Sequence, residues 1–496
     1  METLDGAGIN LNQRFFDAFF PGQVDRSMMR LRRFLSFALS ALACLALLAV
    51  PAAAPVRAQE AGGRRSHIDF IRDAEIEHYL RELVTPIFRA AEIDPASVNL
   101  VLIKDSTINA FVAGGMNMFL YTGLLQITDS PEQLVGVMAH ETGHIAGGHL
   151  IRGSAAMESA SAEAIIGTLL GVAAGVAAGR GDVAIGAIGG AQQVAERNFL
   201  SFSRMQEASA DAAGMHFLDV AGITTRGMME FMEKLADQEL LPPDRQAEYV
   251  RTHPLTQDRV DTIKYHLEHS PLADKKLDPK FAVMHERMKA KLLGFLQPET
   301  ALLRYTDKDP RLPARYARAI ALYQTNQLPR ALTVVDTLLR DEPDNPFFME
   351  LKAQMLFENG HVEESVGLYK QSVALQPDSA LLRVAYAHAM LESKNDARLD
   401  SVIQQLTEAN RLEEREPETW RYLAAAWGRK AEISKNPQDE ALVSYGLAEE
   451  ALARGADREA KQFADRALKG LPKASPYYLR AQDIKLSVDL DEREHR

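Results

Sequence analysis

The sequence predicts a mainly α-helical protein, in which an α+β domain with a small sheet is followed by an α-helical repeat solenoid. Three observations predict this fold class. Apolar residues recur at helical spacing over long stretches, β-rich runs gather within residues 98–120, and a 34-residue period appears after residue 300. The chain has 496 residues, of which 46% are hydrophobic and 25% are charged, so we expect two or three globular domains.

The first 58 residues predict an export signal. An apolar run over residues 34–50 follows a positively charged head, and Ala58 is the small residue that a signal peptidase prefers. We expect cleavage after Ala58, which would also remove Cys44, the only cysteine. The alternative is that residues 34–50 stay in place as a membrane anchor. The positive head consists of Arg30, Arg32 and Arg33.

Residues 66–120 predict a helix followed by two strands. The apolar positions of residues 66–92 have helical spacing, and a β-rich run at residues 98–103 follows the turn at Asp94-Pro95. Beyond a Gly-Gly bend, the side chains of residues 116–120 alternate between the two sides of an extended chain. We expect a second strand there, with a free edge over residues 111–120.

A helix of about 19 residues is predicted to begin after Ser130, which can cap it, with Pro131 at its first position. This helix contains His-Glu-Thr-Gly-His at residues 140–144. At about 3.6 residues per turn, the two imidazoles reach one ion, and Glu141 stands beside that ion. In zinc peptidases with this spacing, two neutral nitrogens bind Zn²⁺ and the glutamate takes a proton from water. The alternative is an exposed helix end with incidental histidines.

A third metal ligand is expected from outside this motif. His149 is one candidate, but on a continued helix it points away from the metal side, which disfavours a metzincin. The other candidate is Glu207, which lies four residues before Asp211 in an alanine-rich segment that permits close helix packing. We predict that Glu207 joins His140 and His144 at the zinc, and that Asp211 accepts a hydrogen bond from a ligating histidine. By itself, this acidic pair would be a solvated helix face.

These paired motifs, preceded by Asn109-Ala110-Phe111 and Gly123-Leu124-Leu125, resemble the gluzincin family that includes the CAAX prenyl protease and the heat-shock protease HtpX. The resemblance covers residues 66 to about 265 and implies a zincin-like metallopeptidase domain with one Zn²⁺ per chain. The zinc ligands that it implies are His140, His144 and Glu207, with Glu141 as the catalytic glutamate.

The resemblance also implies a role for His253, which precedes Pro254. Periplasmic members of the family carry a histidine before a proline at this place, and it can approach the zinc and occupy the position of the water. His253 is therefore expected to be a regulatory ligand, a donor to the transition state, or both. Without the resemblance, a histidine before a proline predicts an ordinary loop residue.

Substrate is expected to bind along the free strand edge by backbone pairing, which gives a loose sequence preference. We therefore assign Asn109, Ala110 and Phe111 to the substrate-binding site and expect cleavage of unfolded or loosely folded segments. Residues 164–191, rich in glycine and alanine, are expected to form a lid over the active site. Shallow membrane contact and a plain helical hairpin are the alternatives for this segment.

The segment after residue 300 predicts tetratricopeptide repeats. Pro343 and Pro377 lie 34 residues apart, each after a helical run, and Ala353 and Ala387 recur ten residues after those prolines. This period matches pairs of antiparallel helices that stack on the next pair. We expect about four repeats with insertions, a capping helix from Pro476, and a concave face that binds a partner or client chain. An ordinary α-helical domain is the alternative.

With its repeats, the chain resembles a narrower group of gluzincins of the Gram-negative periplasm. That resemblance implies a periplasmic endopeptidase that cleaves misfolded or stalled outer-membrane proteins, gives chaperone-like help in their assembly, and docks on the barrel-assembly machinery. The formal charge of -12 argues against a nucleic-acid partner. The rival function is a non-catalytic adaptor or chaperone with a structural or capped zinc site.

The expected organisation has four parts. They are an N-terminal extension with the signal (1–58), a zinc metallopeptidase domain (59–270), a linker helix (271–310) and a tetratricopeptide-repeat domain (311–496).

Overall fold

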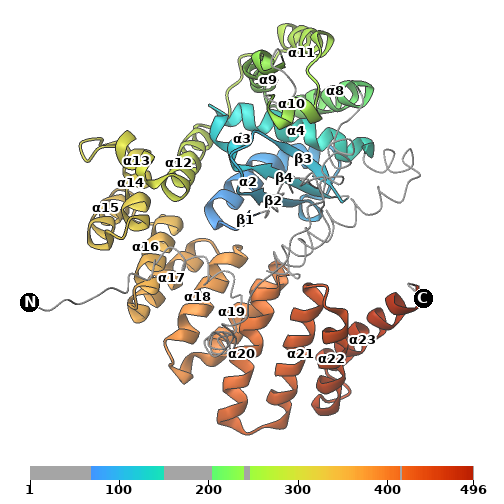
Figure 1. The fold of residues 1–496 in the computed structure, drawn as a ribbon, viewed down its shortest axis with the longest axis vertical. Coiled ribbons are helices and arrows are strands. Elements are labelled where there is room, and N and C mark those ends of the chain that lie inside the picture. Colours follow the sequence, from blue (N-terminus) through green and yellow to red (C-terminus); the bar gives the residue numbers. More distant parts are fainter. Residues whose placement is uncertain (1–68, 115, 150–203, 240–245, 414–415, 495–496) are drawn as a thin grey trace, which may run out of the picture. The chain divides into compact units, whose positions relative to one another are not determined.

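The computed structural model describes residues 69–114, 116–149, 204–239, 246–413 and 416–494 (Figure 1). The predicted export signal and the predicted lid at residues 164–191 lie outside these ranges. Within them, no helix has both the length and the apolar character needed to cross a membrane. The described residues are mainly helical with one small mixed sheet, which confirms the predicted fold class.

The sheet of the N-terminal domain has four strands in the order β1-β2-β4-β3. β1 is antiparallel to β2, β2 is parallel to β4, and β3 is antiparallel to β4. The four strands are β1 (Phe70–Ile71), β2 (Asn99–Ile103), β3 (Ala110–Ala113) and β4 (Asn117–Tyr121).

Only part of the predicted free edge is an edge of this sheet. β4 pairs with β3 on one side, with Ala110 opposite Leu120, and with β2 on the other side, with Asn99 opposite Asn117. The expectation of a free edge as far as residue 120 is therefore wrong. The chain turns after β3 at Gly114, whose φ is 58°, and β4 then enters the interior of the sheet. The edge strand next to the predicted site is β3.

Helices pack against this sheet and complete the core of the domain. α2 packs on β2 and on α4, and α4 in turn packs on β3, α8 and α9. Figure 1 shows α2, α3 and α4 beside the strands. The helices of this part are α2 (Ala74–Ala90), α3 (Thr122–Ile127), α4 (Pro131–Gly147), α8 (Arg204–Ala221), α9 (Arg226–Glu239), α10 (Glu248–Thr252) and α11 (Gln257–His269).

α4 and α8 approach each other closely because small residues face each other. A Cβ atom on Gly143 would lie 2.5 Å from the carbonyl oxygen of Ala210, and one on Gly214 would lie 3.1 Å from the carbonyl carbon of Ala139. Neither glycine position has room for a larger residue without a shift of the neighbouring helix. The small residues of α8 thus permit the close helix packing that the sequence predicts. This packing brings Glu207 and Asp211 of α8 to the histidines of α4.

The C-terminal part consists of paired helices. Consecutive helices pack on each other from α14 to α23, and Figure 1 shows α16 to α22 side by side. α23 begins at Pro476, as predicted for the capping helix. The helices are α12 (Pro279–Leu296), α13 (Pro298–Arg304), α14 (Leu312–Gln324), α15 (Leu328–Asp341), α16 (Pro346–Glu358), α17 (Val362–Leu375), α18 (Ala380–Glu392), α19 (Leu399–Leu412), α20 (Pro417–Ser434), α21 (Pro437–Ala453), α22 (Asp457–Gly470) and α23 (Pro476–Glu494).

A buried charge cluster joins α2 to α12 and α14. Glu75, which is 3% exposed, accepts hydrogen bonds from Arg287 Nε at 2.8 Å and from Tyr316 Oη at 2.6 Å. Lys291 is 2% exposed, and its Nζ lies 2.8 Å from Asp73 and 3.4 Å from Glu75. Because buried charges are costly without partners, each member of the cluster depends on the others.

Candidate metal centre

The histidines of the motif lie one turn apart on α4. Ser130 accepts a hydrogen bond from the backbone nitrogen of Gln133 at 3.2 Å, so it caps the helix as predicted. Both His140 and His144 are buried, and their Nε2 atoms lie 3.1 Å apart. The helix therefore presents two imidazole nitrogens to a common point, as the spacing predicts.

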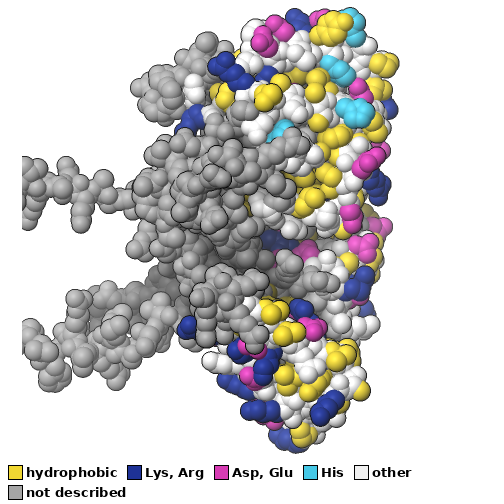
Figure 2. Space-filling model, turned by 90° about the vertical axis from the view of Figure 1, so that its right-hand side faces the viewer, with side chains coloured by type: hydrophobic (Ala, Val, Ile, Leu, Met, Phe, Trp, Pro, Cys, Tyr) yellow, Lys and Arg dark blue, Asp and Glu magenta, His cyan; other side chains and the backbone are white. Residues whose placement is uncertain are grey.

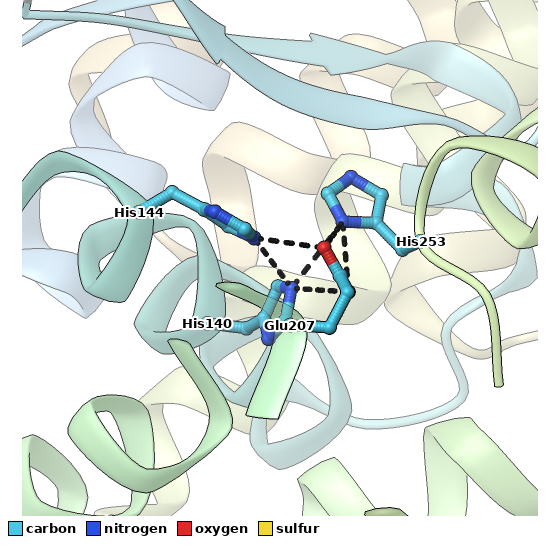
Figure 3. A group of neighbouring side chains, drawn as sticks. All are labelled: His140, His144, Glu207 and His253. Carbon is cyan, nitrogen blue, oxygen red and sulfur yellow. Dashed lines mark hydrogen bonds and ion pairs between the residues drawn. The ribbon is translucent and has the colours of Figure 1, made fainter. Parts of the chain in front are cut away.

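Glu207 of α8 reaches the same point (Figure 3). Its Oε1 lies 3.3 Å from His144 Nε2, and its Oε2 lies 3.4 Å from His140 Nε2. The side chain is 0% exposed. The three predicted ligands thus converge, although 63 residues separate His144 from Glu207.

His253 supplies a fourth donor from the end of α10. Its Nδ1 lies 3.2 Å from Glu207 Oε1 and 3.3 Å from His140 Nε2 (Figure 3). One donor atom from each of the four side chains lies within 4.8 Å of the others. Tyr249 stacks on the His253 imidazole with the ring centroids 4.6 Å apart, which fixes the plane of the ring.

The donor spacing fits a tetrahedral metal ion. Zinc bonds of about 2.0–2.1 Å in tetrahedral geometry separate neighbouring donors by roughly 3.3–3.4 Å. The closest donor pairs here lie 3.1–3.4 Å apart. Three imidazole nitrogens and one carboxylate are also donor types that this kind of ion accepts. The residues present therefore fit a metal ion.

The charges of the centre also favour a cation. Burial disfavours the charged form of His140, but hydrogen bonds to the carboxylates of Asp211 and Glu207 raise its pKa to about 10. Burial lowers the pKa of His144 to about 3. Burial opposes ionisation of Glu207, whereas His253 and the two motif histidines lower its pKa. Without a metal ion, Glu207 thus stays ionised and His140 holds a proton. The positive charge of this proton takes the place of the charge that a metal ion would bring.

The structure brings Asp211 next to His140, one of the predicted ligands. Its Oδ1 accepts a hydrogen bond from His140 Nδ1 at 2.8 Å. This bond leaves the lone pair of His140 Nε2 facing the other donors, which is the tautomer that binds a metal.

Arg259 is a residue of the centre that the sequence alone does not reveal. From α11 it donates to Asp211 through Nε at 2.6 Å and Nη2 at 2.9 Å. Its Nη1 lies 2.9 Å from Glu207 Oε2 and 2.7 Å from the carbonyl oxygen of Pro254. The sequence gives only an indirect signal for Arg259. Two acidic residues buried together, Glu207 and Asp211, require a cation, but the sequence does not say which cation it is.

Glu141 is buried beside the donors and does not belong to them. It is 0% exposed, and neither carboxylate oxygen has a hydrogen-bond partner among the described residues. Its Oε1 lies 3.6 Å from His253 Nε2. Burial raises the pKa of Glu141, so this carboxylate is poised to accept a proton from a molecule placed next to it.

The three predicted substrate-binding residues lie at the start of β3. Asn109 is 1% exposed, and its side-chain oxygen has no hydrogen-bond partner among the described residues. Ala110 and Phe111 are buried, and the Phe111 ring stacks on Phe119 with the centroids 4.8 Å apart. β3 packs against α4, and the backbone nitrogen of Tyr249 donates to the carbonyl oxygen of Ile108 at 3.0 Å. Their role in binding substrate stays a prediction.

The fold and the site define a metallopeptidase that precedes a set of helical repeats. Residues 72–267 match the model of peptidase family M48, and residues 308–445 match that of the tetratricopeptide repeat. The chain therefore carries an M48 peptidase domain followed by tetratricopeptide repeats, and the resemblance to this class of peptidases is confirmed.

Curated proteins match the chain over most of their own length. The chain is 27% identical over 420 residues to the "Beta-barrel assembly-enhancing protease" of Yersinia pestis, which covers 79% of this chain and 82% of that protein. It is 24% identical over 392 residues to the protein of the same name from Escherichia coli (strain K12), with 77% of this chain and 78% of that protein covered. The "Metalloprotease YcaL" of the latter organism is 29% identical over 174 residues, which cover 35% of this chain and 63% of that protein.

Proposed function

We propose that this protein is an exported, zinc-dependent endopeptidase that hydrolyses peptide bonds in misfolded or stalled outer-membrane proteins and assists their assembly. The observation that carries the proposal is the convergence of His140, His144 and Glu207 at tetrahedral spacing with the buried Glu141 beside them. The client class rests on the names of the two assembly-enhancing proteases that resemble the chain over more than three quarters of its length.

Zinc is the metal that this donor set favours. His140, His144 and Glu207 would hold it, because two imidazoles and one carboxylate leave a fourth position for catalysis. When bound, Zn²⁺ supplies Lewis-acid activation of a water molecule and of the substrate carbonyl.

Glu141 carries the proton chemistry in this proposal. Its carboxylate, which has no hydrogen-bond partner among the described residues, accepts a proton from the attacking water and returns that proton to the amine that leaves when the peptide bond breaks. Burial raises the pKa of Glu141, which suits a group that both takes and gives a proton.

His253 closes the fourth position in the resting protein. Its Nδ1 lies 3.3 Å from His140 Nε2 and 3.2 Å from Glu207, so a water molecule cannot share that place with it. Movement of the segment that holds His253 and Tyr249 then opens the site. After this movement, His253 remains near enough to act as a donor to the tetrahedral transition state.

Client chains bind in two places in this proposal. An extended segment pairs with the edge strand β3 at Asn109, Ala110 and Phe111, and the repeats contact the client or the barrel-assembly machinery. Figure 2 shows hydrophobic side chains among charged groups of both signs on the described part of one face. Leu479, Leu486 and Leu490 of α23 are exposed and are available for such a contact. We propose that the reaction takes place in the periplasm, which the predicted export signal supports.

The experiment that tests the activity is the replacement Glu141→Gln in the full chain. This variant keeps the metal donors and loses the base, so we expect normal zinc content and a fall in cleavage of an unfolded outer-membrane protein by about 10²–10⁴-fold. Glu132→Gln, on the same helix, is the matched control and should cleave normally. Unchanged cleavage by Glu141→Gln would overturn the role of Glu141 as the base. Absence of cleavage by the unchanged protein would favour the rival function, a capped adaptor, which the position of His253 on the fourth vertex supports.

A further inference from the structure

We propose that His149 is a positioning residue for His144, and that it holds this ligand in the tautomer and orientation that bind the metal. The inference rests on the proposed zinc site and adds a residue to its supporting shell. Nδ1 of His149 lies 2.9 Å from Nδ1 of His144, and the two ring centroids are 5.0 Å apart. His149 is 4% exposed, so this contact is sheltered from water.

The contact depends on how α4 ends. On a continued helix, a side chain five residues after His144 would point away from the metal. α4 instead stops at Gly147, and Gly148 adopts the left-handed conformation with φ 58° and ψ 33°. The backbone nitrogen of Gly148 donates to the carbonyl oxygen of Ile145 at 3.0 Å, which closes the end of the helix. The reversed chain brings His149 back beside His144.

The absence of a side chain at Gly147 leaves room for the His149 ring. A Cβ atom at position 147 would lie 2.5 Å from His149 Nε2 and 2.8 Å from its Cδ2 and Cε1. Any side chain there would therefore push the ring out of its present position. In the sequence Gly147-Gly148-His149, Gly147 permits the close approach of the ring and Gly148 makes the left-handed turn. Together they bring the imidazole of His149 back to His144.

The hydrogen bond has a defined direction once His144 binds a metal. His144 Nε2 faces the other donors, at 3.1 Å from His140 Nε2 and 3.3 Å from Glu207 Oε1. A neutral imidazole that ligates through Nε2 carries its hydrogen on Nδ1. His144 Nδ1 therefore donates to Nδ1 of His149, which accepts.

The two motif histidines are then held by different partners. Asp211 accepts from His140 Nδ1, and His149 does the same for His144. Such partners of ligating histidines typically change metal affinity by 10–100-fold when they are removed. Asp211 already brings one negative charge to His140. Because the acceptor at His144 is a neutral imidazole, the buried centre does not gain a second negative charge from this shell.

The test compares zinc dissociation constants of full-length variants in competition with a chelator. His149→Ala removes the acceptor, and we expect zinc binding about 10–100-fold weaker. His149→Asn places an amide oxygen near the position of Nδ1, and we expect affinity within about threefold of the unchanged protein. With Co²⁺ as the probe, the visible absorption bands should shift in His149→Ala and be restored in His149→Asn.

His285→Ala is the matched control for loss of a buried histidine. His285 is 2% exposed and bonds to Tyr79 Oη at 2.9 Å and to the carbonyl oxygen of Thr128 at 3.0 Å. This variant should lower the thermal midpoint and leave zinc affinity unchanged, because His285 bonds to Tyr79 and Thr128 and not to the donors.

The outcomes separate this inference from the proposed function. If His149→Ala binds zinc as tightly as the unchanged protein, or if His149→Asn is as weak as His149→Ala, the positioning role is overturned. If the unchanged protein binds no zinc, or if Glu207→Ala binds it equally well, the proposed metal site itself fails.

Discussion

Nη1 of Arg259 lies 2.9 Å from Oε2 of Glu207, the carboxylate that we assign to the metal. The same guanidinium holds Asp211 and the carbonyl oxygen of Pro254, the residue after His253. One buried cation thus contacts a proposed metal ligand, the hydrogen-bond partner of a second proposed ligand, and the segment that carries the fourth donor.

Loss of this cation should destabilise the metal-free protein. Arg259→Leu leaves two buried carboxylates without their guanidinium, and removal of one partner from a buried ion pair costs about 3–5 kcal/mol. Urea unfolding in the presence of a chelator measures this change. Arg226→Ala is the control, because Arg226 pairs with the exposed Asp274 and exposed pairs contribute about 0–1 kcal/mol. Equal effects of both substitutions would contradict the role of Arg259.

Asp211 should govern metal affinity through His140. In Asp211→Asn the side chain keeps its shape but loses the charge that stabilises the bond to His140 Nδ1. We expect zinc affinity to fall by about 10–100-fold, measured by chelator competition. Asp219→Asn, further along α8, changes a carboxylate that pairs with His266 and should bind zinc normally. Unaltered affinity in Asp211→Asn would show that the bond has no part in binding.

Removal of His253 separates its two proposed roles. If its main role is to close the fourth position, His253→Ala should cleave an unfolded outer-membrane protein faster at low substrate concentration, because substrate and water no longer compete with the imidazole. We expect this result, since Nδ1 lies within 3.3 Å of two of the proposed ligands. Initial rates over a range of substrate concentrations measure it. His269→Ala, on α11, is the control. A lower rate at saturating substrate would instead assign His253 to the transition state.

Zinc binding should release a proton at neutral pH. In the metal-free protein, the carboxylates of Asp211 and Glu207 overcome the effect of burial and raise the pKa of His140 to about 10. His140 must lose this proton to bind zinc, whereas His144, whose pKa burial lowers to about 3, is already neutral. Affinity should therefore rise about tenfold per pH unit near neutrality. Titration calorimetry in buffers of different ionisation enthalpy measures the proton, and heats that do not depend on the buffer would contradict it.

The same titration sets the pH dependence of the metal-free fold. A folded pKa above the unfolded value of about 6.5 contributes stability that is fully present below that value. This contribution is lost as the pH rises from about 6.5 through about 10. The metal-free protein should therefore unfold at lower urea concentration at pH 9 than at pH 6. The zinc-bound protein should lack this component, because His140 is neutral in it throughout.

The sequence predicts those features that depend on local rules. Ser130 caps α4 and the motif histidines share one face, because helix geometry fixes both over a few residues. Glu207 is predictable from chemistry, since two histidines require a third donor and the alanines around Glu207 allow α8 to approach α4. The repeats follow from their period, which reflects the pairing of neighbouring helices.

Features that depend on the arrangement of the whole chain are beyond this reasoning. Alternation predicts a free edge that extends too far along the chain, because strand order in a mixed sheet cannot be deduced from alternation alone. The geometry of a continued helix predicts that His149 points away. The left-handed conformation of Gly148 instead reverses the chain and brings the ring beside His144. Arg259 has no motif of its own, and its importance lies in three contacts with different segments.

The burial of Glu75 has a consequence for any attempt to divide the molecule. Its cations, Arg287 and Lys291, belong to α12, and Tyr316, which also bonds to it, belongs to the first helix of the repeats. A fragment that ends after α11 would keep the acid and discard all three of these neighbours. The peptidase domain therefore needs α12 and α14 to pair its buried acid. Shortened versions for crystallisation or screening should end no earlier than the end of α14.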